Sequence, residues 1–169
     1  MTRTISRILV ATDFSAASDL AIDYARALAT QFGASVHLVH VVEDPFVTGT
    51  WHPEVYIASI PGMRATLIDD AAARVARLKP IFDAHGVSVT SEVMVGTPAS
   101  AICDAAVGRR CDLIVMGTHG RSGMAHLLLG SVAEKVIRQA SCPVLTLRAQ
   151  AGASPQEQEL FARDYVPAE

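Results

Sequence analysis

Apolar residues follow two different rhythms along the chain: short continuous runs, and longer stretches in which they recur every three or four positions. The short runs are rich in valine, isoleucine and leucine, which is typical of strands that are covered on both faces. The spaced stretches indicate amphipathic helices. The pattern predicts strands at residues 8–11, 36–42, 87–95, 112–116 and 144–147, and helices at about residues 20–32, 63–85, 98–108 and 131–140.

The order of these elements predicts an α/β fold. Strands that alternate with helices form parallel strand–helix–strand units, and their crossovers are right-handed. We therefore expect an open five-stranded parallel sheet with strand order 3-2-1-4-5, sandwiched by four helices. Ligands of such sheets bind beyond the carboxyl ends of strands where the order reverses, so we expect a site between the first and fourth strands.

Local signals refine the expected elements. Pro80 lies inside the second helical stretch and predicts a kink or an early end there. Ser131 precedes Glu134 by three residues, the spacing of a capping box, so we expect Ser131 to cap the last helix. The third strand alternates only partly and is expected towards the sheet edge. Residues 43–62 form a long segment rich in proline and glycine, which is expected to be functional or mobile.

Composition fits one domain followed by a tail. The chain has 169 residues, 50% of them hydrophobic, which is enough for a single core. Residues 1–148 carry 13 basic and 13 acidic side chains, whereas residues 149–169 carry one basic and four acidic ones. We expect a domain over residues 1–148 and an acidic flexible tail over residues 149–169. A neutral domain without a basic stripe argues against a nucleic-acid partner.

The same composition bears on location. No apolar run approaches the roughly 18 residues that a membrane span needs, and the amino terminus lacks the apolar core of a signal peptide. We therefore expect a cytoplasmic protein without a membrane span.

Glycines are concentrated between the fourth predicted strand and the last predicted helix. Glycine allows backbone amides to approach a ligand closely, and a helix N-terminus attracts anions. The segment is therefore expected to bind phosphate groups, although a loop that only turns a corner is the alternative. Ser131 follows the last glycine where a Walker A loop would have lysine, and the spacing of a dinucleotide fingerprint is missing. The four glycines are Gly117, Gly120, Gly123 and Gly130.

This spacing, Gly117-x2-Gly120-x9-Gly130-Ser131, resembles the ATP-binding signature of the universal stress protein family. Residues 8–15 are similar to that family's first strand and turn, and the resemblance covers residues 7–148. One departure is Ala11, where ATP-binding members often carry proline. The resemblance implies an adenine-nucleotide alpha-hydrolase-like fold that binds ATP, with Mg²⁺ accompanying the phosphates.

The resemblance also implies roles for particular residues. Val41 would present its backbone to the adenine, and residues 11–13 would flank the base and the ribose. Amides and hydroxyls after the fourth strand would hold the phosphates. The expected nucleotide-binding residues are Ala11, Thr12, Asp13, Val41, Met116, Gly117, Thr118, His119, Gly120, Arg121, Ser122, Gly130, Ser131 and Val132.

Two charged residues of this set have alternative interpretations. Asp13 follows the first strand, where it could accept hydrogen bonds from a ribose or help to hold phosphate-bound Mg²⁺. Alternatively, Asp13 or Ser15 only caps the first helix. Arg121 either pairs with an outer phosphate or is an ordinary surface arginine.

Other reactive side chains give little support for catalysis. Cys103, Cys111 and Cys142 lack metal-ligand spacing and are expected to be small buried hydrophobic residues. His37 and His40 are three apart in a predicted strand, so they should point to opposite faces of the sheet.

These observations favour a dimeric, nucleotide-dependent regulatory module in the stress response, with little or no turnover. A slow ATPase or adenylate-transfer enzyme is one alternative, but phosphoryl transfer needs positioned cations, of which the sequence has few. A nucleotide-independent dimeric scaffold or protective protein is another. The fifth strand, Val144–Leu147, is expected at the sheet edge, where pairing with its two-fold mate would satisfy its backbone, as the family resemblance also implies.

Overall fold

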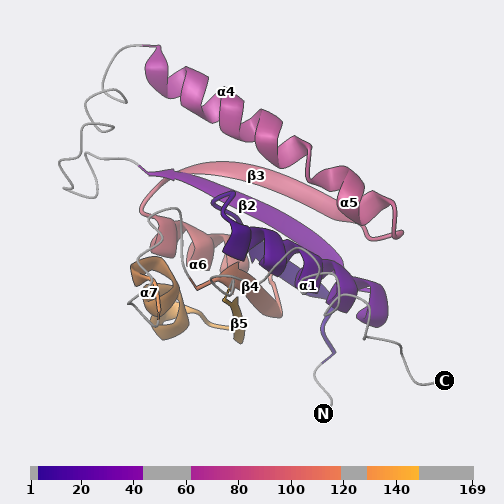
Figure 1. Ribbon diagram of the computed structural model, residues 1–169. Coiled ribbons are helices and arrows are strands. Elements are labelled where there is room, and N and C mark those ends of the chain that lie inside the picture. The colour runs from indigo at the N-terminus through magenta and orange to yellow at the C-terminus, as the bar shows by residue number, and fades with distance from the viewer. Residues whose placement is uncertain (1–3, 44–61, 119–128, 149–169) are drawn as a thin grey trace.

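The computed structural model describes residues 4–43, 62–118 and 129–148 (Figure 1). Within these residues the chain forms a five-stranded sheet with order β3-β2-β1-β4-β5, in which every neighbouring pair is parallel. The expected fold class and strand order are therefore confirmed. The strands are β1 (Arg7–Ala11), β2 (Ser35–Glu43), β3 (Val89–Gly96), β4 (Leu113–Gly117) and β5 (Val144–Leu147); the helices are α1 (Ala16–Phe32), α4 (Met63–Ala76), α5 (Lys79–Asp83), α6 (Pro98–Gly108) and α7 (Ser131–Gln139).

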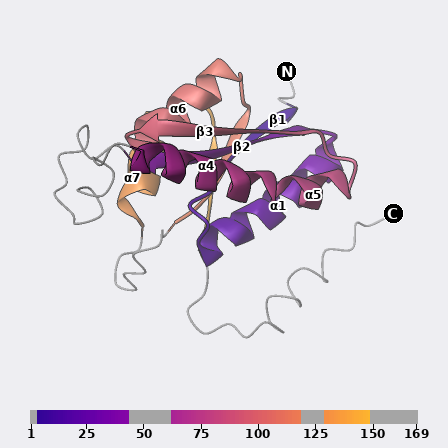
Figure 2. The ribbon, with the colours of Figure 1, turned by 90° about the horizontal axis from the view of Figure 1, so that it is seen from above.

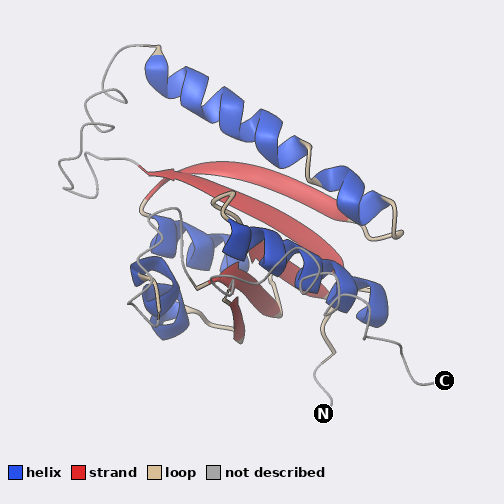
Figure 3. Ribbon diagram, in the orientation of Figure 1, coloured by secondary structure: helices blue, strands red, loops and turns tan. Residues whose placement is uncertain are grey.

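Helices cover both faces of the sheet (Figure 3). Ile8 and Val10 of β1 face α1, α4 and α5, whereas Leu9 and Ala11 face α6 and α7, because successive side chains of a strand point to opposite sides. On the first face, α4 packs over β2 and β3 while α1 packs over β1 and β4 (Figure 2). The central strands are therefore buried on both sides, which explains their continuous apolar runs.

The first helix packs through small residues. Its buried side chains are mainly alanines, which let the helix lie close to the sheet. Tyr24 and Phe32 share the helical spacing of these alanines, but their side chains are 43% and 45% exposed. Ser15 caps the helix, and Gly33 ends it in the left-handed conformation.

The second helical stretch is broken where proline predicted an early end. α4 stops at Ala76, and α5 begins at Lys79 with Pro80 in its first turn, where a missing amide hydrogen costs little. In this stretch Leu67 is 40% exposed, whereas Phe82 is fully buried.

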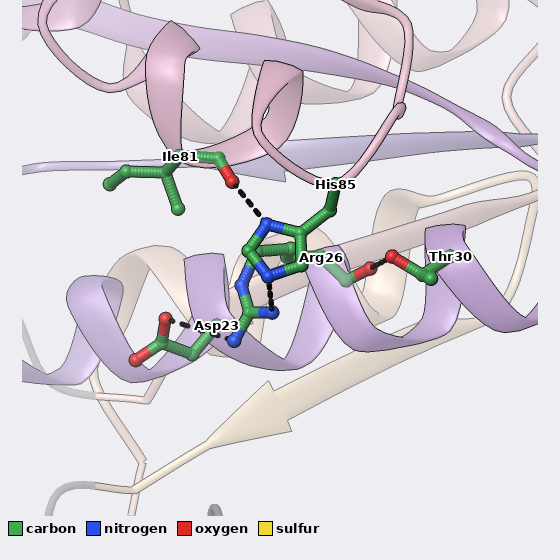
Figure 4. A network of polar contacts seen from close by, with 5 residues as sticks. All are labelled: Asp23, Arg26, Thr30, Ile81 and His85. Atoms are coloured by element: carbon green, nitrogen blue, oxygen red, sulfur yellow. Dashed lines mark hydrogen bonds and ion pairs between the residues drawn. The ribbon is translucent and has the colours of Figure 1, made fainter.

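A polar network ties α5 to α1 (Figure 4). His85, just after α5, donates from Nδ1 to the carbonyl of Ile81 at 3.0 Å, so its Nε2 accepts from Arg26 at 3.1 Å. Arg26 also lies 3.8 Å from Asp23. α1 and α5 are thus joined at the surface as well as through the core.

Two expectations about local structure have different outcomes. β3 is an edge strand of the described sheet, as its partly alternating pattern predicted. The capping box is wrong, because the N-cap of α7 is Gly130, and Ser131 is already helical. The carbonyl of Gly130 accepts from the amide of Glu134 at 2.9 Å, so the first helical hydrogen bond begins one residue earlier than the spacing indicated.

Candidate functional site

The expected binding residues converge at the carboxyl ends of three adjacent strands. Ala11, the last residue of β1, is in register with Val39 of β2 and Met116 of β4. Val41, near the end of β2, and Val132, in the first turn of α7, belong to the same apolar cluster as Ala11 and Met116. Residues far apart in sequence thus meet on the sheet face that α6 and α7 cover.

The turn between β1 and α1 is held by its own polar side chains. The amide of Thr12 donates to the carbonyl of Val39 at 2.9 Å, and its hydroxyl accepts from the amide of Phe14 at 3.1 Å. Thr12 and Ser18 are buried, with their hydroxyl oxygens 3.1 Å apart. This hydrogen bonding pre-organises the turn.

Asp13 and Ser15 have separate roles in this turn. The Oδ1 atom of Asp13 accepts from the amide of Ser15 at 3.1 Å and from its hydroxyl at 2.6 Å. Ser15 in turn caps α1, accepting from the amide of Ser18 at 3.3 Å. Of the two residues that the sequence offered as caps, Ser15 is the cap, and Asp13 orients it while standing half-buried at the end of β1.

The charge near Asp13 is negative. Burial raises the pKa of Asp19 in the first turn of α1, and the nearby carboxylates of Asp23 and Asp13 raise it further, while Arg74 opposes them. A ligand group beside Asp13 should therefore be a hydrogen-bond donor or a cation rather than a bare phosphate.

The two ends of the glycine-rich segment meet. The amide of Thr118 donates to the carbonyl of Leu147 in β5 at 2.7 Å, and the carbonyl of Thr118 accepts from the amide of Gly130 at 2.6 Å. Thr118 is buried. The start of the segment and the N-cap of α7 are therefore adjacent, as a phosphate-binding loop requires. The expected residues His119, Gly120, Arg121 and Ser122 lie outside the described part of the chain.

Gly117 has a structural role that the sequence did not reveal. A Cβ atom at this position would lie 2.8 Å from the Cβ of Ala17 and 2.9 Å from its backbone carbon. Glycine is needed here because α1 begins against the end of β4. Ala17 is 100 residues away in the chain, so no local pattern could have indicated this contact.

Among the described residues, no side chain caps the start of the helix that follows the segment. Gly130 has an extended backbone (φ −71°, ψ 150°) and no side chain to cap α7. The amides of Ser131 and Val132 lie in the first turn, where backbone N–H groups lack helical partners and the helix carries a partial positive charge. This end of α7 can accept an anion.

Three residues that the sequence did not assign to the site meet at the β1–α1 turn: Phe14 within it, and His40 and Arg74 beside it. Phe14 has a left-handed backbone with φ 62°. Its ring centroid is 4.5 Å from that of His40, and the guanidinium of Arg74 lies 3.9 Å above the ring. His40 donates from Nδ1 to the carbonyl of Thr12 at 2.8 Å. The aromatic character of Phe14 gave no signal, because an aromatic residue after a strand usually belongs to the core.

The two neighbouring histidines of β2 point to opposite faces, as their spacing predicted. His40 lies in the Phe14 cluster on the α1 side, whereas His37 lies 3.3 Å from Glu92, which also binds Arg109 just beyond α6. Burial lowers the pKa of His37, and nearby Arg109 lowers it further, although Glu92 opposes them.

The cysteines lie against the core rather than at this site. All three are half-buried and pack on the apolar cluster under α6 and α7. Burial raises the pKa of each thiol, that of Cys111 to about 11. They pack as small hydrophobic residues, as predicted, but none of them is fully buried. Among the described residues, no group of three or more histidine, cysteine, aspartate or glutamate side chains could hold a metal ion.

The arrangement defines a doubly wound α/β domain of the adenine-nucleotide alpha-hydrolase-like type, with polar turns gathered where the strand order reverses. Residues 4–148 match the universal stress protein family, and the chain belongs to that family. In the described parts of the chain, no helix is long and apolar enough to cross a membrane.

Individual relatives agree with this assignment. The universal stress protein MJ0531 of Methanocaldococcus jannaschii is 35% identical over 147 residues, which cover 84% of this chain and 81% of that protein. The solved structure of MJ0577 from the same organism has a TM-score of 0.77 and 27% identity, covering 89% of this chain and all of the other. A universal stress protein from Archaeoglobus fulgidus, solved in complex with dAMP, shares the fold with a TM-score of 0.53, 22% identity and coverage of 86% and 99%.

Proposed function

We propose that this protein binds an adenine nucleotide, with ATP as the first candidate, at the carboxyl ends of β1, β2 and β4. The observation that carries the proposal is the meeting of two devices: the hydrogen-bonded turn that presents Asp13, and the Thr118–Gly130 junction that opens α7. The carboxylate of Asp13 can accept hydrogen bonds from a ribose, and the N-terminus of α7 can bind phosphates. The Archaeoglobus relative was solved in complex with dAMP, which supports an adenine nucleotide as the class of ligand.

Each device has a role in this proposal. The backbone of Val41 meets the adenine, and the apolar cluster that Val41 shares with Ala11 and Met116 offers a surface for the base. Asp13 accepts hydrogen bonds from the ribose hydroxyls. The amides of Ser131 and Val132 bind the phosphates, together with groups of the segment from Met116 to Ser122.

Mg²⁺ fits this site only as a companion of the nucleotide. Asp13 lies at the end of β1, beside the proposed nucleotide, and the described residues contain no group of three or more metal-binding side chains. Magnesium commonly keeps several waters and takes one or two carboxylates in addition to phosphate oxygens. Asp13 would supply that carboxylate.

The proposed activity is regulatory, with little or no turnover. Lys135 of α7 is a full turn beyond the proposed phosphate position and lies exposed. Because phosphoryl transfer depends on cations that are already positioned, this distance supports binding more than hydrolysis. A slow ATPase remains the alternative, and it would release phosphate steadily.

Two further features belong to the proposal. β5 ends the described sheet, with all four of its residues only half-buried, which supports a homodimer formed through Val144–Leu147. Light scattering during size-exclusion chromatography tests this dimer, and a monomer at micromolar concentration would contradict it. The cytoplasmic location, the domain over residues 1–148 and the acidic tail over 149–169 stay predictions; the tail lies outside the described residues.

Mass spectrometry of the ligand released when freshly purified protein is denatured tests whether a nucleotide is bound and identifies it. Calorimetry with ATP, ADP and AMP then ranks the affinities. We expect Asp13→Ala to weaken binding about tenfold or more, because hydrogen bonds to a charged group are lost. Asp104→Ala is the matched control, since Asp104 is exposed on α6, and it should bind like the wild type. No released nucleotide and no heat with any of the three would refute the proposal.

A further inference from the structure

The β1–α1 turn contains a bulky residue in a conformation that normally belongs to glycine. Phe14 has φ 62°, in the left-handed region, where a Cβ atom crowds the following carbonyl. Such a conformation persists only where the surroundings impose it. Asp13 and Ser15 flank this residue, so whatever holds Phe14 also holds the carboxylate proposed to bind the ribose.

Two elements on the α1 side hold the ring of Phe14. The imidazole of His40, near the end of β2, stacks against it with the ring planes tilted by 35° and the centroids 4.5 Å apart. The guanidinium of Arg74, on α4, lies over it at 3.9 Å. The ring also packs against the apolar core beneath α1 and α4. We call these three residues the Phe14 clamp.

The clamp is connected to the proposed site by two hydrogen bonds, each between a side chain and a backbone group. His40 donates to the carbonyl of Thr12, and the amide of Phe14 donates to the hydroxyl of Thr12. Asp13 therefore lies between Thr12, which is bonded to His40, and Phe14, which is itself part of the clamp. Arg74 also lies close enough to Asp19 to oppose the negative charge of that cluster.

Resting on the proposed nucleotide binding, we propose that Phe14 is a positioning residue for the site, and that Arg74 couples the docking of α4 to nucleotide affinity. Phe14 does not contact the nucleotide in this scheme. It maintains the left-handed turn that directs the Asp13 carboxylate beyond the end of β1. Because coupling between sites is reciprocal, a bound nucleotide would in turn hold Arg74, and with it α4, more firmly against the turn.

Arg74→Gln tests the coupling because it removes the cation but keeps a long polar side chain. We expect ATP affinity to fall about threefold to tenfold, the range that loss of a partly desolvated cation–π contact gives. Arg77→Gln is the matched control: Arg77 is exposed at the end of α4 and should leave affinity unchanged. Equal affinity of Arg74→Gln and wild type would overturn the coupling while leaving nucleotide binding intact.

Phe14 variants separate positioning from mere stability. Phe14→Tyr keeps the ring and should retain affinity, whereas Phe14→Gly relieves the backbone strain but removes the ring and should lose affinity. Phe82→Leu, a substitution in the buried core under α5, serves as a control for general destabilisation. Nucleotide affinity and the urea midpoint are compared across the Phe14 variants and Phe82→Leu. If affinity falls in proportion to the midpoint in all of them, the positioning role is wrong.

Hydrogen exchange in the nucleotide-free protein tests the clamp without a ligand. We expect Arg74→Gln to raise the exchange rates of the Phe14 and Ser15 amides several-fold, and to leave those of β5 unchanged. Unchanged exchange at the turn would overturn the clamp whatever the nucleotide result. A wild-type protein with normal protection at the turn but no affinity for any adenine nucleotide would instead refute the proposed function, and the positioning role with it.

Discussion

The two ends of the central strands use aspartate in opposite ways. At the amino end, the Oδ2 atom of Asp112 accepts from the amide of Ser6 at 2.9 Å, from its hydroxyl at 2.7 Å and from the amide of Arg7 at 2.8 Å. At the carboxyl end, the described bonds of Asp13 run to Ser15, two residues away. Asp112 joins distant parts of the chain, whereas Asp13 shapes one local turn.

This difference separates structural from functional demands. The amino end satisfies its carboxylate with donors from Ser6 and Arg7, at the start of β1, and the hydroxyl bond from Ser6 is the main cause that lowers the pKa of Asp112. The carboxyl end holds the left-handed Phe14 and the crowded Gly117. Arg110, just before β4, also has a left-handed backbone with φ 52°. What sets the carboxyl end apart is the combination of a left-handed aromatic residue and a crowded glycine where a ligand is proposed to bind.

The largest expected effect comes from filling the space at the carboxyl end. Gly117→Ala would bring a Cβ atom against the backbone of Ala17, which cannot move aside as a side-chain tip can. We expect a loss of about 2–3 kcal/mol in the free energy of unfolding, measured by urea denaturation.

Gly108→Ala is the matched control, because a Cβ atom there meets nothing within 4 Å. Its stability should stay within about 0.5 kcal/mol of the wild type or rise slightly. A Gly117→Ala protein as stable as this control would contradict the close approach of α1 to β4.

An intermediate effect is expected at the amino end. Asp112→Ala removes three hydrogen bonds near the surface, where water replaces part of them, so the loss should be about 1–2 kcal/mol at neutral pH. Nucleotide affinity should not change, in contrast to Asp13→Ala. If Asp112→Ala and Asp13→Ala lost nucleotide affinity equally, the proposed division into a structural amino end and a ligand-binding carboxyl end would be wrong.

The pH dependence of this effect has a definite sign. The folded-state pKa of Asp112 lies below its ordinary value of 3.8, so its contribution is fully present above that pH. The contribution disappears as the pH falls through the folded-state value. The stability difference between wild type and Asp112→Ala should therefore close in acid.

The smallest expected effect involves His37, which lies on the amino half of β2. Its ring is buried, with Nδ1 2.8 Å from the Thr90 hydroxyl, and its Nε2 atom lies 3.3 Å from Glu92 without the alignment of a hydrogen bond. Burial, the main cause, lowers its pKa from the ordinary value of 6.5, so the unfolded chain takes up a proton first as the pH falls.

The stability that His37 contributes is therefore present above pH 6.5 and is lost as the pH falls through the folded-state pKa. His37→Asn should lose less stability than the wild type between pH 7 and pH 5 in urea denaturation. A steeper loss in the variant would mean that Glu92 outweighs burial and holds the protonated ring.

Much of the fold followed from the sequence. Continuous apolar runs predicted the five parallel strands and their order, and Pro80 predicted the break that ends α4. The apolar spacing of α1 is a poorer guide to its contacts, because Tyr24 falls within that spacing but is exposed, whereas alanines make most of the contact. Helical spacing shows that a buried face exists, but the distance to the sheet decides whether large or small side chains fill it.

The candidate site could be predicted only in part. Asp13 and Gly130 stand at strand and helix ends, where the chemistry of turns and helix termini is local and therefore visible in the sequence. The capping box was wrong because Ser131 and Gly130 are both compatible with a helix start, and the bond from Gly130 to Thr118 favours the glycine. His119 and Gly120, with the rest of that segment, lie outside the described residues.

The sequence by itself determined the class of fold, the strand order and the position of the glycine-rich segment, because these depend on periodicity and on residues adjacent in the chain. Only the tertiary structure decided that Gly117 makes room for α1, that Asp112 binds Ser6, and that Arg74 lies over Phe14. Those contacts join residues 60 to about 106 positions apart. They exist only after the helices have packed onto the sheet, and packing distance leaves no mark in a local sequence pattern.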